Sequence, residues 1–304
     1  MIGCFCRVFE CSVVCVMFST TYAIAEDDAL DAFMKNAREL RSYCCLMEVD
    51  LVENLPDVNN SKFFNQTFTC VCDDENRRRR FDHFPEFDSG NADKIPIAGN
   101  SFFVLEDEKK LFLYNRSPKM VTFSFEEVKK SEMKVFYCAP FSSTMIGYPS
   151  FTGRSISGLA DDDLAKLFKR FVVQKREDAA AVEIVDYRVS SQAPVFCTVL
   201  HDKEIGGMPK ATEIVLRGPG SEPRELGKSR LEWKKLGDAW VPVLQRSETI
   251  SAGGPASAGG YNMVCTVKYR WSLSTPETVW KFGDEFLYPD DLKAYILEHE
   301  HIFK

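Results

Sequence analysis

The clearest hydrophobic pattern in the chain lies at residues 261–273, where apolar and polar residues alternate almost without exception. A period of two places successive side chains on opposite faces of a β-strand. One apolar face and one polar face are typical of antiparallel sheets, which often bury only one side. The residues on the apolar side are Met263, Cys265, Val267, Tyr269 and Trp271.

Segments with the same period recur along the chain and predict a sheet of about eleven or twelve strands. The polar connections at residues 73–76 and 106–110 predict two β-hairpins. The other predicted strands are residues 42–52, 66–72, 77–84, 101–105, 111–114, 120–125, 182–189, 194–200, 211–217, 228–236 and 240–250, with a short one at 134–138.

Three segments have helical periodicity instead. Residues 29–40 place apolar side chains on one face, and Asp27 and Asp28 suit the positive end of a helix dipole. Residues 161–173 repeat this pattern, again with acidic residues first. Pro289 suits the first turn of a helix that ends near residue 302.

Strands outnumber helices, and they do not alternate with helices as in a parallel sheet. We therefore predict an α+β chain with a mainly antiparallel sheet, which at this size curls into a barrel or splits into a sandwich. Residues 139–160 are rich in Ser, Gly and Pro and are the only plausible seam between halves. Neither half has a complete set of helices and strands, so we expect a single domain at residues 26–304.

Residues 1–25 have the order of a secretion signal. Arg7 precedes an apolar core at residues 11–18, and Ala23 and Ala25 are the small residues that signal peptidase requires before a cut at Glu26. The apolar core is shorter than the roughly 20 residues that span a bilayer. We expect export to the periplasm or the extracellular space, with no membrane span in the mature chain.

Composition narrows the classes of partner. The formal net charge of −7 argues against a general nucleic-acid binder, which needs a basic face. Hydrophobic residues make up 45% of the chain and include 24 Phe, which is enough for a large core or an apolar ligand site. The partner we expect is a hydrophobic small molecule or a lipid.

The cysteines leave three alternatives open. Buried free thiols, one disulfide between the strand of Cys44 and Cys45 and the strand of Cys70 and Cys72, and a zinc site all fit the spacing. The zinc site lacks the paired Cys-x-x-Cys hooks that give a strong prediction. An odd number remains after residues 1–25 are removed: Cys44, Cys45, Cys70, Cys72, Cys138, Cys197 and Cys265.

No motif in the sequence carries catalytic, cofactor or metal chemistry. The run at residues 77–80, four consecutive arginines, is predicted to be a solvated edge strand, because successive side chains point to opposite faces. His299 and His301 would diverge by about 200° on a helix and chelate poorly, so we expect a frayed, solvated C-terminus. His83 has no Gly-x-Ser-x-Gly elbow in the sequence to support a serine triad, and His201 is the fourth histidine.

The order of elements resembles the LolA-like fold of periplasmic lipoprotein carriers. The segment from Asp28 through Tyr43 into a strand at residues 44–53 matches the helix that enters a long meander there, and residues 231–242 resemble a hairpin of secreted bacterial proteins of that shape. The resemblance covers most of residues 27–275 and leaves residues 288–304 unexplained. It implies a curved half-open β-barrel of about 11 strands, with helices packed at the concave side.

The resemblance also implies an apolar cleft for a lipid or acyl chain, without fixing the task or any ligand residue. The first hypothesis is a secreted or periplasmic binding protein and not an enzyme. The alternatives are a non-catalytic envelope scaffold or protein-interaction domain with a filled core, and an exported hydrolase without a recognisable motif.

Overall fold

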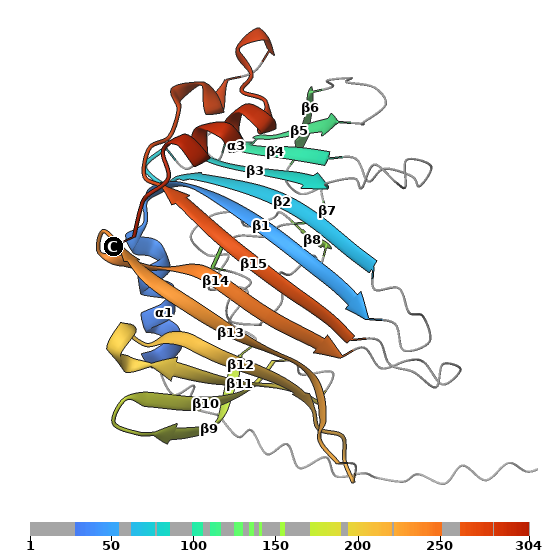
Figure 1. Ribbon diagram of the computed structural model, residues 1–304, viewed down its shortest axis with the longest axis vertical. Helices are drawn as coiled ribbons and strands as arrows, with labels where there is room; N and C mark the ends of the chain where they lie inside the picture. The colour runs from blue at the N-terminus through green and yellow to red at the C-terminus, as the bar shows by residue number, and fades with distance from the viewer. Residues whose placement is uncertain are drawn as a thin grey trace, which may run out of the picture.

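One antiparallel sheet organises the computed structural model (Figure 1). Its strand order is β6-β5-β4-β3-β2-β1-β15-β14-β13-β12-β11-β10-β9, and a separate two-stranded sheet pairs β7 with β8. The structure describes residues 28–54, 62–76, 78–85, 99–105, 110–116, 125–129, 134–136, 140–141, 153–155, 171–189, 194–220, 222–250, 262–281 and 283–303.

The helices are α1 (Asp28–Glu39) and α3 (Pro289–Glu298), and short 3₁₀ turns are Lys203–Ile205, Glu277–Trp280 and Gly283–Glu285. The strands of the first half are β1 (Ser42–Asn54), β2 (Lys62–Asp73), β3 (Arg78–Pro85), β4 (Gly99–Leu105), β5 (Lys110–Arg116), β6 (Phe125–Lys129), β7 (Lys134–Phe136) and β8 (Gly153–Ser155). Those of the second half are β9 (Val172–Asp178), β10 (Val182–Arg188), β11 (Val195–Asp202), β12 (Met208–Leu216), β13 (Arg224–Leu236), β14 (Ala239–Ile250) and β15 (Asn262–Ser272).

Two meanders join in the middle of the sheet. β1 to β6 run outward in chain order, β9 to β15 run inward, and β1 pairs with β15 so that Val49 lies opposite Val267. The sheet is therefore continuous across two segments that lie far apart in sequence. This confirms the predicted fold class, a mainly antiparallel, curved and open sheet.

The two helices cover opposite faces of the sheet. We call the face that α1 covers the inner face, where Phe33 packs in one core with Met47 and Val267. The opposite, outer face meets α3, whose Leu292 and Ile296 pack in a second core. The expectation grouped the helices on one side, so α3 differs from it, and α3 lies in the segment that the LolA resemblance left unexplained.

Most predicted strands match the structure, including both hairpins, β2 with β3 and β4 with β5. Of the strand expected at residues 120–125, residues 120–124 lie outside the described residues. Of the helix expected at residues 161–173, residues 161–170 lie outside them, and Val172 and Val173 begin β9 instead. That strand is mostly charged and exposed, as sheet edges commonly are, so it lacks the alternation that identifies a strand.

The predicted signal segment, residues 1–25, lies outside the described part of the chain, and so does Glu26. Within the described part, no helix is both long and apolar enough to cross a membrane.

Candidate functional site

Apolar side chains form continuous rows across the inner face. Strand register places Trp271, Cys45, Cys70 and Phe81 in one row from β15 to β3, because antiparallel partners point to the same side. None of the four side chains is more than 5% exposed. The neighbouring row includes Phe68, whose ring stacks on that of Phe81 with 5.7 Å between centroids.

An aromatic cluster packs where α1 meets this face. The ring of Phe33 makes edge contacts with Trp233 and Phe141 at 6.3 and 6.2 Å between centroids. The indole N–H of Trp233 donates to the carbonyl oxygen of Pro209 over 2.7 Å, so its polar atom is satisfied inside the core. Dense packing of this kind favours a filled core at this end of the inner face.

Asn36 fixes α1 to the sheet. Its Nδ2 donates to the carbonyl oxygen of Trp240 over 2.7 Å, and its Oδ1 accepts the backbone N–H of Trp240 over 2.6 Å. The side chain is only 8% exposed, so both backbone groups of Trp240 depend on it rather than on water. This amide positions the helix against β14.

A set of buried hydroxyl and amide groups interrupts the apolar inner face between β12 and β15. We call it the polar stripe; its members are Thr212, Ser229, Gln245, Ser247 and Tyr269. The Tyr269 hydroxyl donates to Gln245 Oε1 over 2.7 Å, and Gln245 Nε2 donates to Ser247 Oγ over 3.3 Å. The hydroxyl oxygens of Thr212 and Ser229 lie 2.7 Å apart. Polar groups of this kind orient a ligand in an otherwise apolar site.

The sequence analysis missed the polar stripe. Gln245 and Ser247 are separated by two positions in the strand predicted at residues 240–250, so they share a face. Ser229 lies opposite Ser247 in the adjacent strand. The sequence alternation shows that Gln245 and Ser247 share a face, but only the pairing of β13 with β14 shows that Ser229 is their neighbour.

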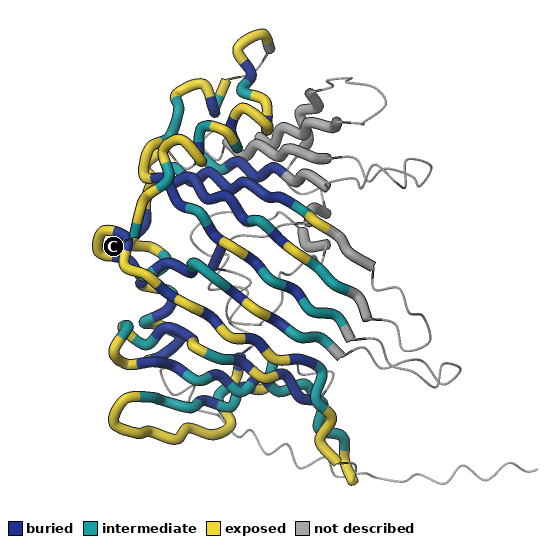
Figure 2. Tube along the Cα trace, in the orientation of Figure 1, coloured by how far each residue is buried: buried dark blue, intermediate teal, exposed yellow. Residues whose placement is uncertain are grey.

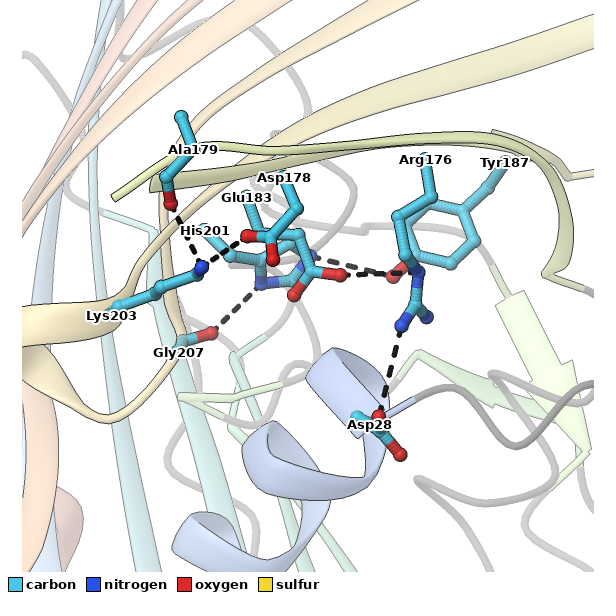
Figure 3. A network of polar contacts seen from close by, with 9 residues as sticks. All are labelled: Asp28, Arg176, Asp178, Ala179, Glu183, Tyr187, His201, Lys203 and Gly207. Atoms are coloured by element: carbon cyan, nitrogen blue, oxygen red, sulfur yellow. Dashed lines mark hydrogen bonds and ion pairs between the residues drawn. The ribbon is translucent and has the colours of Figure 1, made fainter. Parts of the chain in front are cut away.

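His201 is the centre of a second polar network on the inner face, near the β9 edge (Figure 3). Its Nδ1 lies 2.8 Å from the carbonyl oxygen of Gly207, which can only accept, so Nδ1 carries the proton. Its Nε2 therefore accepts from the hydroxyl of Tyr187, 3.4 Å away. The imidazole is fully buried, and its two nitrogens lie within hydrogen-bond distance of a backbone carbonyl oxygen and a tyrosine hydroxyl, which suits a structural role.

Charged residues close the same edge around the start of α1. Arg176 Nε lies 3.1 Å from Glu183 Oε1, and Arg176 Nη1 lies 3.9 Å from Asp28 Oδ2 (Figure 3). Lys203 pairs with Asp178 in the adjacent β9–β10 hairpin. These half-exposed pairs connect β9, β10 and α1 at the rim of the inner face, which suits a structural role.

The outer face is closed at the α3 end by a buried ion pair. Arg80 Nε lies 2.8 Å from Asp82 Oδ2, and both side chains are completely inaccessible. Arg80 also donates to the carbonyl oxygens of Leu287, over 2.7 Å, and Val279, over 3.3 Å. Thr69 Oγ1 donates to Asp82 over 2.8 Å, so the charged groups have partners as burial requires.

The prediction of a solvated edge strand for residues 77–80 was therefore wrong. β3 lies inside the sheet between β2 and β4, and Arg80 is 1% exposed. Sequence alternation alone could not show that the chain's C-terminal segment covers this strand. Two of these arginines are neutralised by nearby acids, because Arg78 pairs with Asp73 and Arg79 pairs with Asp74.

The C-terminus is also less frayed than predicted. The backbone N–H of His301 donates to the carbonyl oxygen of Trp271 over 2.7 Å, and Glu300 accepts from Arg270 over 2.9 Å. His299 and His301 are both exposed, as expected. The ring of His299 stacks on that of Tyr295, with 4.0 Å between centroids.

The described cysteines are free and buried. Cys45 and Cys70 lie directly opposite each other in β1 and β2, and of the described cysteines they alone are register partners. Burial raises the pKa of Cys70, Cys197 and Cys265 to about 12, which leaves these thiols protonated at neutral pH. Within the described residues, no group of three or more His, Cys, Asp or Glu side chains is placed to hold a metal ion. Cys138 lies outside the described residues.

Comparison with known proteins gives structural likenesses only. No family model matches the chain, and no curated protein matches it. A DUF1329 family protein from Desulfovibrio piger is similar at 10% identity and a TM-score of 0.44, over 83% of this chain and 95% of that one. A domain from Vibrio parahaemolyticus described as an outer membrane lipoprotein-sorting protein is similar at 11% identity and 0.42, over 82% and 96%.

A LolA superfamily protein from Nitrosomonas europaea is similar at 12% identity and a TM-score of 0.39, over 83% of this chain and 97% of that one. The LolA-like resemblance inferred from the sequence thus recurs among solved structures. With TM-scores below 0.5, the likeness transfers no ligand or activity to this chain.

Proposed function

We propose that this chain is a non-catalytic binding protein that holds a lipid or acyl chain against the inner face of its sheet. The observation that carries the proposal is the width of that apolar face. It runs across nine strands from β3 to β10, a distance of about 38 Å at strand spacing. α1 has 12 residues and is about 18 Å long, so this helix by itself spans about half of that width.

The polar stripe supports an amphiphilic rather than a purely apolar ligand. Its hydroxyl and amide groups lie between β12 and β15, beside apolar residues such as Val267 and Cys265. An ester or carboxyl group would exchange hydrogen bonds with Tyr269 and Gln245 while its acyl chain lies along the apolar rows. In this arrangement the stripe sets the orientation of the ligand, and the apolar rows supply most of the affinity.

We also propose that the protein acts after export, as a single domain of residues 26–304. The support is the order of residues 1–25, with Ala23 and Ala25 before Glu26. N-terminal sequencing of the mature protein is expected to begin at Glu26, and Ala25→Arg is expected to block processing. A protein that retains Met1 in the cytoplasm contradicts export.

A second candidate is a scaffold whose core is filled by its own side chains. The aromatic cluster of Phe33, Phe141 and Trp233 favours it, because these rings occupy one end of the inner face. The two candidates predict different contents for the purified protein. A binding protein carries or takes up an acyl ligand, and a scaffold does neither.

Native mass spectrometry of protein purified from its own envelope tests the choice. We expect co-purifying acyl species, and calorimetric titration of stripped protein with laurate to show a negative heat-capacity change and little dependence on salt. Tyr269→Phe, which removes one hydroxyl from the stripe, is expected to weaken binding several-fold. The exposed control Lys235→Gln leaves it unchanged. Protein that is ligand-free and binds neither laurate nor a phospholipid is a scaffold.

A further inference from the structure

A groove of about 750 Å³ crosses the outer face, on the side of the sheet away from the proposed ligand face. It runs over β10 to β15, while α3 packs on β1, β2 and β15 at the other end. Figure 2 shows exposed and half-buried residues alternating with buried ones along these strands. Its volume falls within the range of small-molecule sites.

Two arginines face each other in the groove. Arg230 of β13 and Arg246 of β14 are direct register partners, so both side chains project from the outer face, and both are exposed. Like charges directly opposite each other on adjacent strands destabilise a sheet. Among the described residues, neither arginine makes an ion pair, whereas neighbouring Lys228 lies 3.2 Å from Glu248 and 3.5 Å from Glu225. A repulsive pair without a counter-ion is suited to an anion supplied from outside the chain.

The same row continues with apolar residues. Register places Ile184, Leu200 and Ala211 in line with Arg230, on β10, β11 and β12. All three are half-buried and line the groove. At the usual spacing between strands, these three residues form an apolar stretch about 10 Å long beside the arginines. The groove therefore has a cationic end and an apolar end.

The acidic neighbours limit where an anion fits. Glu213 lines the groove opposite Lys228, and Glu248 is engaged by Lys228. Both acids lie in the row adjacent to the arginines, one on each side of Lys228. The position between Arg230 and Arg246 is therefore the place in the groove where two cations face each other.

We propose that this groove binds an anionic amphiphile, with a carboxylate or phosphate group between Arg230 and Arg246 and an apolar body over Leu200 and its neighbours. The proposal is independent of a ligand on the inner face. A planar guanidinium offers two parallel donors to either kind of oxyanion, so the headgroup chemistry is shared by fatty acids and phospholipids.

Titration calorimetry with two probes tests the site: laurate and a short-chain lysophosphatidic acid, each below its micelle concentration. Binding in the groove is expected to weaken with added salt, unlike binding at the inner face, and the variant Arg230→Gln/Arg246→Gln is expected to weaken this salt-sensitive binding at least tenfold. Lys268→Gln, an exposed cation on the same face outside the groove, is the matched control and leaves binding unchanged. The tighter probe distinguishes a carboxylate headgroup from a phosphate.

Further measurements separate this site from the inner face and from misfolding. The double glutamine variant is expected to melt at or above the wild-type temperature, because it removes a like-charge contact. Acetate, which has no apolar body, is expected to bind the wild-type protein far more weakly than laurate. Leu200→Ser is expected to weaken laurate binding and to leave the affinity for acetate unchanged. Salt-sensitive probe binding that survives the double variant, or acetate and inorganic phosphate binding as tightly as the amphiphiles, overturns the proposal. Loss of the salt-sensitive binding in Tyr269→Phe but not in the double variant assigns that binding to the inner face and also overturns the proposal.

Discussion

Arg80 and Phe81 are adjacent in β3, and both are buried, but they face different surroundings. Phe81 points to the inner face, where it stacks on Phe68 in an apolar core. Arg80 points to the outer face, where Asp82 and two carbonyl oxygens of the C-terminal segment surround it. At β3 the inner face is thus packed by apolar side chains, and the outer face is buried because the C-terminal segment folds over it.

Farther along the sheet the contrast is between buried and exposed. On β15, Val267 is 2% exposed on the inner face, and Lys268 is exposed on the outer one. One face of the same strand therefore meets an apolar core and the other meets water, so the cost of placing a charge on it depends on which face the position occupies. Four sets of variants, from the largest to the smallest expected effect, test the difference between the two faces.

Val267→Asp is expected to cost about 4–5 kcal/mol, because it places an unpaired carboxylate in the inner core. Lys268→Asp is expected to cost less than about 1 kcal/mol, because its side chain meets water. That small cost comes from the like-charge contact between the new acid and Glu48, which lies opposite it. Urea denaturation of both variants measures the difference. Equal unfolding midpoints would mean that the two faces of β15 are not distinct.

Arg80→Met is expected to cost about 3–4 kcal/mol, because it leaves Asp82 buried without its counter-charge. The double variant Arg80→Met/Asp82→Leu is expected to recover much of this loss, since no unpaired charge remains. Arg78→Met, which breaks a half-exposed pair with Asp73 on the same face, is the control at about 0–1 kcal/mol. A double variant no more stable than the single one would show that the ion pair itself, and not the burial of an orphan charge, is what matters.

Asn36→Ala is expected to cost about 2 kcal/mol by leaving the N–H and carbonyl oxygen of Trp240 without partners. Lys35→Ala, one position earlier and exposed, is expected to change the free energy of unfolding by less than about 0.5 kcal/mol. Hydrogen exchange at the Trp240 amide would rise in the first variant only. Unchanged protection there would mean that α1 is held to the inner face by its apolar side chains alone.

The sequence was informative wherever the signal is local. Alternation along residues 261–273 correctly assigned Val267 inward and Lys268 outward, and the helix at residues 29–40 matches α1 within one residue at each end. The edge strand β9 was missed, because its charged residues carry no apolar period.

Long-range contacts account for the remaining differences. The burial of Arg80 depends on Leu287, about 200 residues away, and the polar stripe depends on the register of β13 with β14. Neither contact has a local signature. The sequence therefore predicted which residues share a face of a single strand. It could not predict which segments cover that face or which polar groups are neighbours on adjacent strands.

The smallest expected effect is the pH dependence of the Arg78–Asp73 pair, the exposed counterpart of Arg80–Asp82. Partial burial raises the pKa of Asp73, but hydrogen bonds from Asn76 and Arg78 outweigh it and hold the pKa below its usual value. A carboxyl group whose pKa is lowered in the folded state stabilises the fold at pH values above its unfolded pKa of about 3.9. This contribution is lost as the pH falls through the folded pKa. Asp73→Asn is therefore expected to cost about 0.5 kcal/mol at pH 7, and this cost is expected to shrink toward zero as the pH falls through the lowered folded pKa. Thermal unfolding of both proteins from pH 2 to pH 7 measures this, and a difference that persists at pH 2 would assign the loss to the turn geometry around Asn76 instead of to charge.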